Sequence, residues 1–284
     1  MIVSVSRRTD IPAFYADWFF NRLREGFVCV RNPMNAGQVR RVELSPHSVD
    51  CFVFWSKNPA PMIDRLALLD DYKYYFQFTV NGYGADIEPR VPSVDEVTAT
   101  FARLSDLIGP RRVVWRYDPV LFAGHIDADY HRRRFEAIAG RLCGRTERCM
   151  ISFVDIYGKM RRRFDAVHGR GLSACQMRSL AADFARIASA YGMRVYTCAE
   201  KIDLESVGVE HGCCIDGRLI GALSEGVYIA KRASGQRSEC GCVQSVDIGR
   251  YDTCMHNCLY CYANVGHESV MRNYMAHDPL SPFM

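Results

Sequence analysis

Short apolar runs recur along the whole chain, and they constrain its fold more than any other feature. They are rich in β-branched and aromatic residues and show little polar alternation, which is typical of strands buried on both faces of a sheet. Amphipathic segments separate them. The predicted strands comprise residues 2–6, 27–31, 51–56, 74–80, 112–117, 149–155 and 194–198, with 245–249 as an eighth candidate.

Helix start signals lie between several of these runs. Ser93 with Glu96, and Ser173 with Gln176, match the capping box, in which a hydroxyl at the helix start pairs with an acid or amide three residues later. Asp10 lies two residues before Pro12 and begins a third predicted helix. Strands that alternate with helices, without an internal sequence repeat, predict parallel strands joined by right-handed crossovers.

The number of predicted strand–helix units indicates the fold class. Seven or eight parallel strands predict an α/β fold of the TIM-like type, with a full or partial parallel β/α barrel. No linker rich in proline, glycine or serine divides the 284 residues. We therefore expect one domain over 1–284, in which residues 240–264 form a cysteine-rich region.

Three cysteines near the C-terminus have the spacing C-x-x-x-C-x-x-C: Cys254, Cys258 and Cys261. Three thiolates at this spacing can hold three corners of a 4Fe–4S cube, whereas a closed electron-transfer cluster takes four. The fourth iron is then free to bind a substrate or cofactor, much as a catalytic zinc keeps an open position. Zinc is the alternative metal, and His256 or Cys240 could then supply the fourth ligand.

The segment around these cysteines, YDTCMHNCLYCYAN (251–264), resembles the cluster loop of radical S-adenosylmethionine (SAM) enzymes, above all the spore photoproduct lyase branch. Tyr260, just before the last cysteine, adds to the match. The resemblance implies that the open iron binds the amino and carboxylate groups of SAM. One electron then breaks the sulfonium bond into methionine and a 5′-deoxyadenosyl radical. A one-electron donor of the flavodoxin or ferredoxin type is also implied.

The chain as a whole resembles a bacterial family, domain of unknown function 1848. The segments that carry this resemblance are SVSRRTD (4–10), FWSKNP (54–59), SVDIG (245–249) and the cluster loop. It covers nearly all of the chain, and it brings no known reaction with it.

The position of the cluster loop predicts a rearranged barrel. In most radical SAM enzymes this loop follows the first barrel strand, but here it lies near the C-terminus. If strand 245–249 lies beside strand 2–6, the barrel is a circular permutation of the usual one, which is tolerated where chain termini are close. The end of strand 2–6 then takes the place whose residues help to bind the SAM amino group. This resemblance implies SAM or substrate contacts for Arg7, Arg8, Thr9 and Asp10.

Polar residues follow nearly every predicted strand. The carboxyl ends of parallel barrel strands converge on one face, where active sites lie. We therefore expect these residues to form the wider pocket for SAM or substrate, although strand ends are also ordinary polar loops. The candidates are Asn32, Lys57, Asn58, Asn81, Arg116, Asp118, Asp155 and Glu200, with Tyr260 from the cluster loop.

A second group of cysteines is scattered over residues 198–242. Cys198, Cys214, Cys240 and Cys242 could hold a closed auxiliary 4Fe–4S cluster, and Cys213 could replace Cys214. The alternatives are a zinc ion or two pairs of reduced thiols.

Composition indicates a reducing compartment. The chain has thirteen cysteines, an odd and clustered set that favours reduced thiols and metal over disulfides, and we expect a cytoplasmic protein. No apolar run is long enough to span a bilayer, and the N-terminus lacks the pattern of a signal peptide. The net charge of +4 does not by itself indicate nucleic acid. Arginine runs at 132–134 and 161–163 are either solvated faces or phosphate contacts.

Two functions of different classes follow. The first is an enzyme that cleaves SAM reductively at an open 4Fe–4S cluster and starts radical chemistry on an unknown substrate, which could be a nucleic acid. The alternative is a non-catalytic barrel, stabilised by iron–sulfur or zinc, that binds nucleic acid or a protein partner. Reductive cleavage of SAM distinguishes them.

Overall fold

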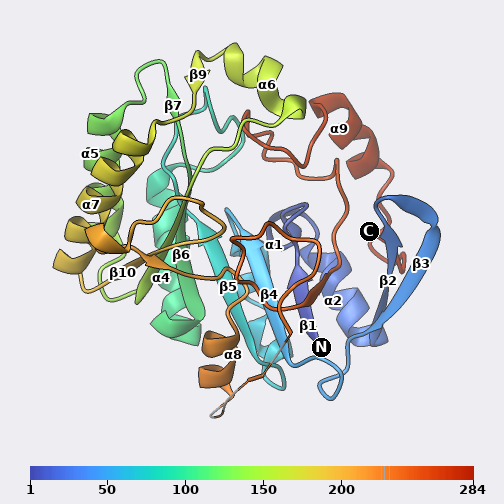
Figure 1. Ribbon diagram of the computed structural model, residues 1–284. Coiled ribbons are helices and arrows are strands. Elements are labelled where there is room, and N and C mark those ends of the chain that lie inside the picture. The colour runs from blue at the N-terminus through green and yellow to red at the C-terminus, as the bar shows by residue number, and fades with distance from the viewer. Residues whose placement is uncertain (225, 227, 230) are drawn as a thin grey trace.

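A computed structural model of the protein describes residues 1–224, 226, 228–229 and 231–284. Its centre is an eight-stranded sheet with the spatial order β11-β10-β8-β6-β5-β4-β1-β12 (Figure 1). The strands are β1 (Ile2–Val5), β4 (Cys51–Ser56), β5 (Tyr74–Thr79), β6 (Val113–Val120), β8 (Arg148–Phe153), β10 (Arg194–Thr197), β11 (Glu210–His211) and β12 (Ser245–Asp247).

Every neighbouring pair in this sheet is parallel, as the sequence predicts. From β1 to β11 the strands follow one another across the sheet in chain order. The last strand then returns to the first, and Ser245 of β12 lies opposite Ile2 of β1. The predicted pairing of 245–249 with 2–6 is therefore confirmed. Within the described residues β11 and β12 are not hydrogen-bonded to each other, so the sheet keeps two edges.

Helices connect the strands. Both predicted capping boxes are present, at Ser93 with Glu96 and at Ser173 with Gln176, and the Asp10 side chain caps the first helix. The helices are α1 (Ile11–Phe14), α2 (Ala16–Glu25), α3 (Ala60–Ile63), α4 (Val94–Ile108), α5 (Ala128–Arg141), α6 (Gly158–Asp165), α7 (Ala174–Ala190), α8 (Gly217–Leu223) and α9 (His267–Met275). Short 3₁₀ turns occupy Leu66–Leu69, Pro110–Arg112 and Glu205–Val207.

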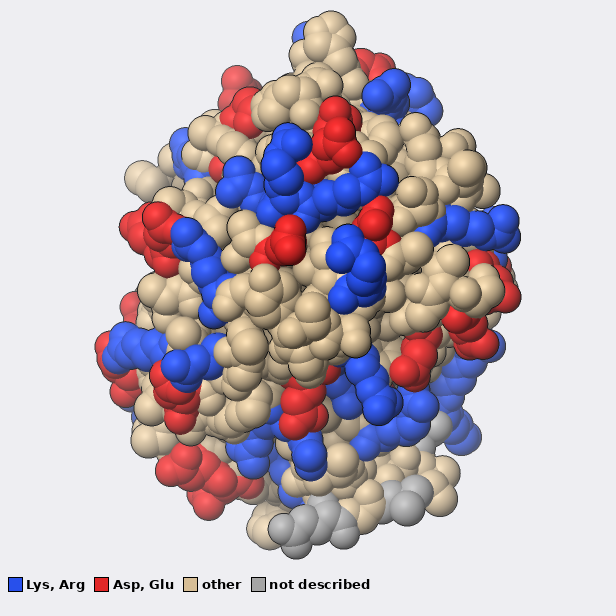
Figure 2. Space-filling view, turned by 90° about the vertical axis from the view of Figure 1, so that its left-hand side faces the viewer, with Lys and Arg blue, Asp and Glu red and all other residues tan. Residues whose placement is uncertain are grey.

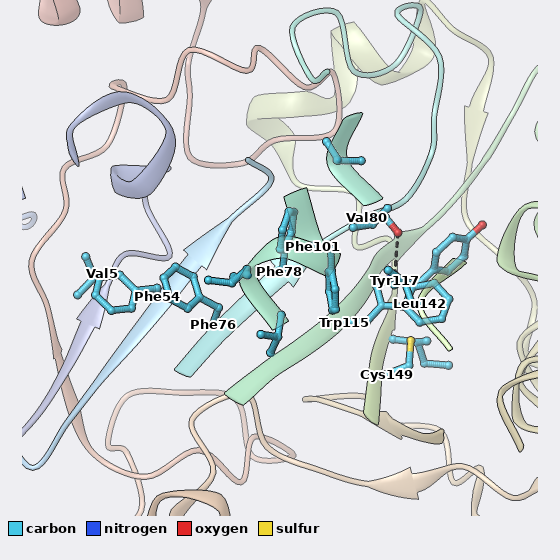
Figure 3. Packing of buried hydrophobic residues seen from close by; sticks show 14 of the residues in the cluster. Val5, Phe54, Phe76, Phe78, Val80, Phe101, Trp115, Tyr117, Leu142 and Cys149 are labelled. Atoms are coloured by element: carbon cyan, nitrogen blue, oxygen red, sulfur yellow. Dashed lines mark hydrogen bonds between the residues drawn. The ribbon is translucent and has the colours of Figure 1, made fainter. Parts of the chain in front are cut away.

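One face of the sheet packs on the helices through large apolar side chains (Figure 3). Phe54 stacks on Phe76 with ring centroids 4.7 Å apart, and Trp115 stacks on Phe135 of α5 at 4.6 Å. The Trp115 indole also donates a hydrogen bond of 2.9 Å to the Val80 carbonyl, which satisfies its polar atom. Burial of one such aromatic side chain is worth about 2–3 kcal/mol, so this face carries much of the stability of the fold.

The opposite face of the sheet is covered by the chain segment that follows β11. Alternate strand residues such as Ile2, Val53 and Val114 pack there against Ile215 and α8. Figure 1 shows this segment crossing in front of the strands, with α8 at the lower edge. Two strand side chains fix it, because the Tyr75 hydroxyl and the Gln77 amide donate hydrogen bonds of 2.8 and 2.7 Å to the Cys214 carbonyl.

One predicted sheet strand is wrong. Residues 27–31 lie in β2 (Phe27–Asn32), which pairs with β3 (Asn35–Glu43) as an antiparallel hairpin outside the main sheet (Figure 1). The physical reason is the short turn, because only antiparallel strands can be joined by so few residues. Asn32 is exposed and bonds to Gln38 on the hairpin, so it is not a pocket residue. The eighth place is taken by β11, whose two residues are too few to form a pattern.

Two further short strands, β7 (Phe122–Ala123) and β9 (Gly169–Arg170), form a separate antiparallel pair. The side of the molecule that carries α5 and α7 shows basic and acidic side chains intermixed (Figure 2). Arg132 there pairs with Asp129 and Asp183 at 2.6 Å each, so it belongs to a solvated face of ion pairs. Across the described residues, no helix combines the length and the apolar character needed to cross a bilayer.

Candidate metal and cofactor site

A cavity of about 610 Å³ lies where the strands of the main sheet end. Its walls come from the ends of β1, β4, β6, β8 and β10 and from residues 251–264, which we name the cluster loop. Both groups of cysteines reach it, although they are far apart in the sequence. They are Cys254, Cys258 and Cys261 on the cluster loop, and Cys198, Cys214, Cys240 and Cys242 on the other side.

The three cluster-loop thiols share this cavity without converging on one point. Among the described residues, the cysteine sulfurs that lie within 4.8 Å of one another belong to Cys198, Cys240 and Cys242. The sulfurs of the cluster loop do not meet this limit. Such spacing suits ligands that each bind a separate iron. Burial raises the pKa of the Cys258 thiol well above its usual value, and the nearby Lys57 ammonium opposes that effect. A thiolate at Cys258 therefore depends on a bound metal for its stability.

Asp10 anchors the cluster loop to the sheet. Its carboxylate contacts His256 Nε2 of the loop at 2.8 Å, and both side chains are buried. The same carboxylate accepts hydrogen bonds from Ser56 Oγ (2.8 Å) and the Lys57 amide (2.7 Å), and it caps α1 through the Ala13 amide (3.0 Å). Asp10 lines the cavity, but these contacts already use both of its oxygens.

A buried polar group lies behind Cys258. Lys57 Nζ is 2.7 Å from Glu88 Oε1, and Glu88 also accepts hydrogen bonds from the Tyr260 hydroxyl and, at 3.1 Å, from the Asn81 amide. Burial lowers the pKa of Lys57, but Glu88, Cys258 and Asp10 together more than offset it, so the pKa is raised and the ammonium stays charged. Tyr260 thus links the cluster loop to the ends of β4 and β5.

Arg7 and Arg8 lie at the junction between β1 and β12. Asp247 accepts hydrogen bonds from Ser4 Oγ (3.0 Å) and the Arg7 amide (2.9 Å), and the Arg8 guanidinium donates to the Gly249 carbonyl (3.2 Å). Gly249 is required there, because a Cβ at that position would overlap the Ser6 side chain. The two arginine side chains remain 26% and 21% exposed, so both can contact a ligand in the cavity.

Arg116 lines the cavity and contacts the second group of cysteines. Its Nη1 is 2.8 Å from Cys214 Sγ, its other nitrogen pairs with Asp118, and its guanidinium lies over the Trp55 ring at 4.9 Å. Ser152 Oγ donates to the Asp118 carboxylate at 2.5 Å. Arg116 is thus held by an acid, a sulfur and an aromatic face.

Two acidic side chains line the remaining wall of the cavity. Asp155 pairs with Arg237 Nη1 at 2.6 Å. Glu200 accepts a hydrogen bond of 2.8 Å from the Phe153 amide, and burial raises its pKa to about 7. The cavity therefore contains a carboxyl group that can exchange a proton near neutral pH.

Besides Asn32, two predicted pocket residues do not line the cavity. Asn58 accepts a hydrogen bond of 3.3 Å from the Ala60 amide, at the start of α3. Asn81 is buried behind the wall, where its Oδ1 accepts from the Asp118 amide at 2.8 Å. Both are strand-end residues, but they point into the loops rather than into the space between them.

Glu88 and Asp247 were not among the predicted site residues, and His256 was predicted only as a possible zinc ligand. Asp247 was not indicated because the predicted strand continues to residue 249, whereas the observed β12 ends at Asp247. Glu88 was not indicated either, since it lies in an irregular stretch between β5 and α4. The contact of His256 with Asp10 joins residues 246 positions apart, which no local pattern shows.

Several buried polar atoms around the cluster loop have no partner among the described residues. Arg163 Nη2 donates to the Cys261 and Asn264 carbonyls at 2.8 and 2.9 Å, but its Nε and Nη1 are buried and unpaired. Thr9 Oγ1, in the cavity wall, is also unpaired. Buried polar groups without a partner are rare, and they can mark a place where a ligand, an ion or water binds. The residues present are compatible with a bound metal ion or iron–sulfur cluster.

The second group of cysteines is tightly gathered. The sulfurs of Cys198, Cys240 and Cys242 all lie within 4.8 Å of one another, and those of Cys198 and Cys242 are 3.9 Å apart. The neighbouring Cys198 and Cys242 thiols, together with Arg116, lower the pKa of Cys214 below its usual value. This group could hold a metal ion or a cluster.

The chain matches one known protein family. Residues 2–263 match a family profile described as domain of unknown function (DUF1848). The chain belongs to this family. No curated protein matches this DUF1848 chain. Among solved structures, it is similar to a proposed alpha-L-fucosidase from Bacteroides thetaiotaomicron VPI-5482, at 10% identity over 81% of this chain and 84% of that one, with a TM-score of 0.27. A similarity of this degree indicates neither fold nor activity.

Proposed function

We propose that this DUF1848 protein is a radical-SAM-like enzyme, with a 4Fe–4S cluster on Cys254, Cys258 and Cys261 and with SAM in the adjoining cavity. The proposal rests on the observation that all three thiols line one cavity. Buried hydrogen-bond donors without a partner lie beside them. A structural zinc site would instead gather its ligands around one point. The unpaired Arg163 donors next to Cys261 suit the sulfur atoms of a cluster.

We also infer that residues 1–284 form one domain, a partial TIM-like barrel circularly permuted relative to ordinary radical SAM barrels. The pairing of β12 with β1 supports this, because it brings the cluster loop and the β1 end together. The contact between His256 and Asp10 supports it as well. In this arrangement the predicted SAM-contact residues Arg7 and Thr9 line the same cavity as the cluster cysteines.

The residues of the chain take separate parts in this function. When bound, the cluster and SAM supply the reductive cleavage that starts radical chemistry, with an electron from a donor of the flavodoxin or ferredoxin type. Arg7 and Arg8 line the cavity with partly exposed side chains that can bind the SAM carboxylate. Glu200 can hold or release a proton near neutral pH. Tyr260, through its hydrogen bond to the buried Lys57–Glu88 pair, fixes the cluster loop that carries Cys258.

The substrate must fit beside SAM in the same cavity. A volume of about 610 Å³ lies within the range of small-molecule pockets. Lys57, Arg116 and Asp118 remain as polar groups that could orient it. The resemblance to spore photoproduct lyase makes a nucleic acid one candidate, with a flipped-out base as the part that enters. All thirteen cysteines are free thiols, which supports a reducing, cytoplasmic setting.

The test is anaerobic reconstitution, with iron and sulfide counted per chain and electron paramagnetic resonance of the reduced protein recorded with and without SAM. We expect a signal that SAM perturbs and the formation of 5′-deoxyadenosine. Cys258→Ala should lose both, whereas Cys143→Ala, at an exposed free cysteine, should keep both. A Cys258→Ala protein that still cleaved SAM at the wild-type rate would contradict the proposal.

A second candidate is favoured by the close gathering of Cys198, Cys240 and Cys242. In this alternative the metals are structural, and the barrel binds nucleic acid or a protein partner without catalysis. Nucleic-acid binding through phosphates would weaken steeply with added salt. This function would be accepted if such binding occurred while the reduced protein formed no 5′-deoxyadenosine.

A further inference from the structure

The sulfur spacing of the second cysteine group distinguishes a single metal ion from a cluster. A tetrahedral ion with metal–sulfur bonds of about 2.3 Å places its sulfurs about 3.8 Å apart. In a 4Fe–4S cube each thiolate binds a separate iron, so the width of the cube spreads the sulfurs to on the order of 6 Å. The observed 3.9 Å between Cys198 and Cys242, with Cys240 within 4.8 Å of both, matches the single ion.

The fourth ligand follows from the contacts of two adjacent cysteines. Cys214 is buried, packs in the same group of side chains as Cys240 and Cys242, and lines the cavity with the other three cysteines, although its sulfur lies outside the group within 4.8 Å. Cys213 is half-buried and points instead at Gly241, where an added Cβ would lie 2.6 Å from its sulfur. Cys214 therefore completes the set, and Cys213 flanks it.

Donors around the sulfurs resemble the outer shell of a thiolate metal site. The Ile215 amide donates to Cys242 Sγ at 3.4 Å, and Arg116 Nη1 lies 2.8 Å from Cys214 Sγ. Such donors orient the ligands and offset the negative charge of several thiolates around one divalent ion. A closed set of four thiolates is the usual ligand set of structural zinc.

The four cysteines also lie where the sheet is least complete. Cys198 follows β10, Cys214 follows the edge strand β11, and Cys240 and Cys242 precede the other edge strand, β12. Both edge strands are short, and β11 has only two residues. The segments beyond them meet through a hydrogen bond of 3.1 Å from the Val243 amide to the Ile215 carbonyl. A metal ion at this place would cross-link the two edges of the sheet.

We propose that Cys198, Cys214, Cys240 and Cys242 bind one zinc ion, which joins the segments at both edges of the sheet and so completes the wall of the cavity. This site is independent of the cluster on the other side, and it has a structural role that the SAM chemistry does not require. Its ligands come from three separate segments, so the ion is held only when the sheet is assembled.

The first test removes the cluster ligands and counts what remains. The triple variant Cys254→Ala/Cys258→Ala/Cys261→Ala should retain one zinc per chain, with neither iron nor sulfide. Four irons with sulfide in this variant would overturn the proposal, because they would show a second cluster. One iron without sulfide would overturn the choice of zinc, and a metal-free chain would overturn the site.

The second test identifies the ligands with a matched pair of adjacent residues. Cys214→Ser should lose the zinc or bind it at least tenfold more weakly, whereas Cys213→Ser should bind it as the wild type does. Cobalt(II) exchanged into the wild-type protein should give the absorption of a tetrahedral thiolate site, which guards against variants that fail to fold. Equal zinc binding by the two serine variants, or an octahedral cobalt spectrum, would overturn the assignment.

Discussion

The two groups of cysteines on this cavity differ in both sequence and geometry. Cys254, Cys258 and Cys261 lie within eight consecutive residues, yet their sulfurs do not converge within 4.8 Å. Cys198 and Cys242 are 44 residues apart in sequence, yet their sulfurs are 3.9 Å apart. Closeness in sequence and closeness in space are therefore reversed between the two groups.

This reversal reflects two ways of holding a metal. A compact sequence motif forms one loop that wraps around a cofactor larger than an ion, and the rest of the fold only has to anchor that loop. In this protein Asp10, Glu88 and Arg163 anchor the cluster loop. Scattered ligands instead meet because the sheet brings their strands together, so the metal reports on the fold and stabilises it. We expect changes to the first group to affect mainly activity and changes to the second to affect mainly stability.

The largest predicted effect tests this division directly. Cys242→Ala should lower the free energy of unfolding by on the order of 4 kcal/mol, because it removes a ligand of a structural ion and leaves three thiols without their metal. Cys258→Ala, in protein without a cluster, should cost only about 1 kcal/mol, as expected for a small buried truncation. Urea unfolding under reducing conditions measures both. Equal losses would remove the distinction between the two groups.

The buried pair under the cluster loop should give the next largest effect. Lys57→Met leaves the Glu88 carboxylate buried without its cation, and breaking a buried pair in this way costs about 3 kcal/mol. The double variant Lys57→Met/Glu88→Gln should recover part of that loss, since no charge is then stranded. Iron loading should fall in the single variant while zinc content stays unchanged. A parallel loss of zinc would mean that the two sites are not independent.

The strand–helix order of the fold was predictable from the sequence because it depends on local patterns. Buried strands such as β4 and β5 are continuous apolar runs, and capping boxes mark the starts of α4 and α7. The hairpin at β2 and β3 was not recognised, since an isolated apolar run does not show which partner it will take. The two-residue β11 is too short for any periodicity, and it is defined only by its pairing with β10.

The candidate site was predictable to the extent that it depends on spacing and strand ends. The cluster cysteines, Arg7 and Arg116 all line the cavity, as expected. The polar contacts that hold them could not be predicted, because they join distant residues such as Asp10 with His256 and Lys57 with Glu88. The arrangement of the second cysteine group likewise depends on the path of the segment after β11 across the sheet.

A third prediction provides a reference that involves neither cysteine group. His131 of α5 is fully buried between the Tyr117 hydroxyl and the Leu121 carbonyl, and burial lowers its pKa to about 4. Between pH 6.5 and pH 4, His131 is therefore protonated in the unfolded chain but not in the folded one. The free energy of unfolding falls on acidification, by about 2 kcal/mol at pH 5 relative to pH 7. In His131→Asn this part of the pH dependence should be absent.

The comparison between pH 7 and pH 5 also separates this effect from the metals. Acid weakens metal binding because thiolate ligands must be deprotonated. The His131 contribution should therefore persist in metal-free protein, where contributions from both cysteine groups are lost. If removing the metals abolished the whole pH dependence, His131 would not be the titrating group. Urea unfolding at the two pH values, with and without metal, gives the answer.

The smallest predicted effect depends on whether the cluster is bound. In cluster-free protein, Arg163→Met removes two hydrogen bonds to the cluster loop but also two buried donors without partners, so the net loss should be about 1 kcal/mol. If those donors face the cluster, the same variant should bind less iron and should shift the resonance signal of the reduced cluster. Arg161→Met, on the exposed side of the same helix, is the matched control and should change neither. An Arg163→Met protein with wild-type iron content and an unaltered resonance signal would show that the unpaired donors do not face the cluster. That result would remove one of the two observations on which the cluster assignment depends.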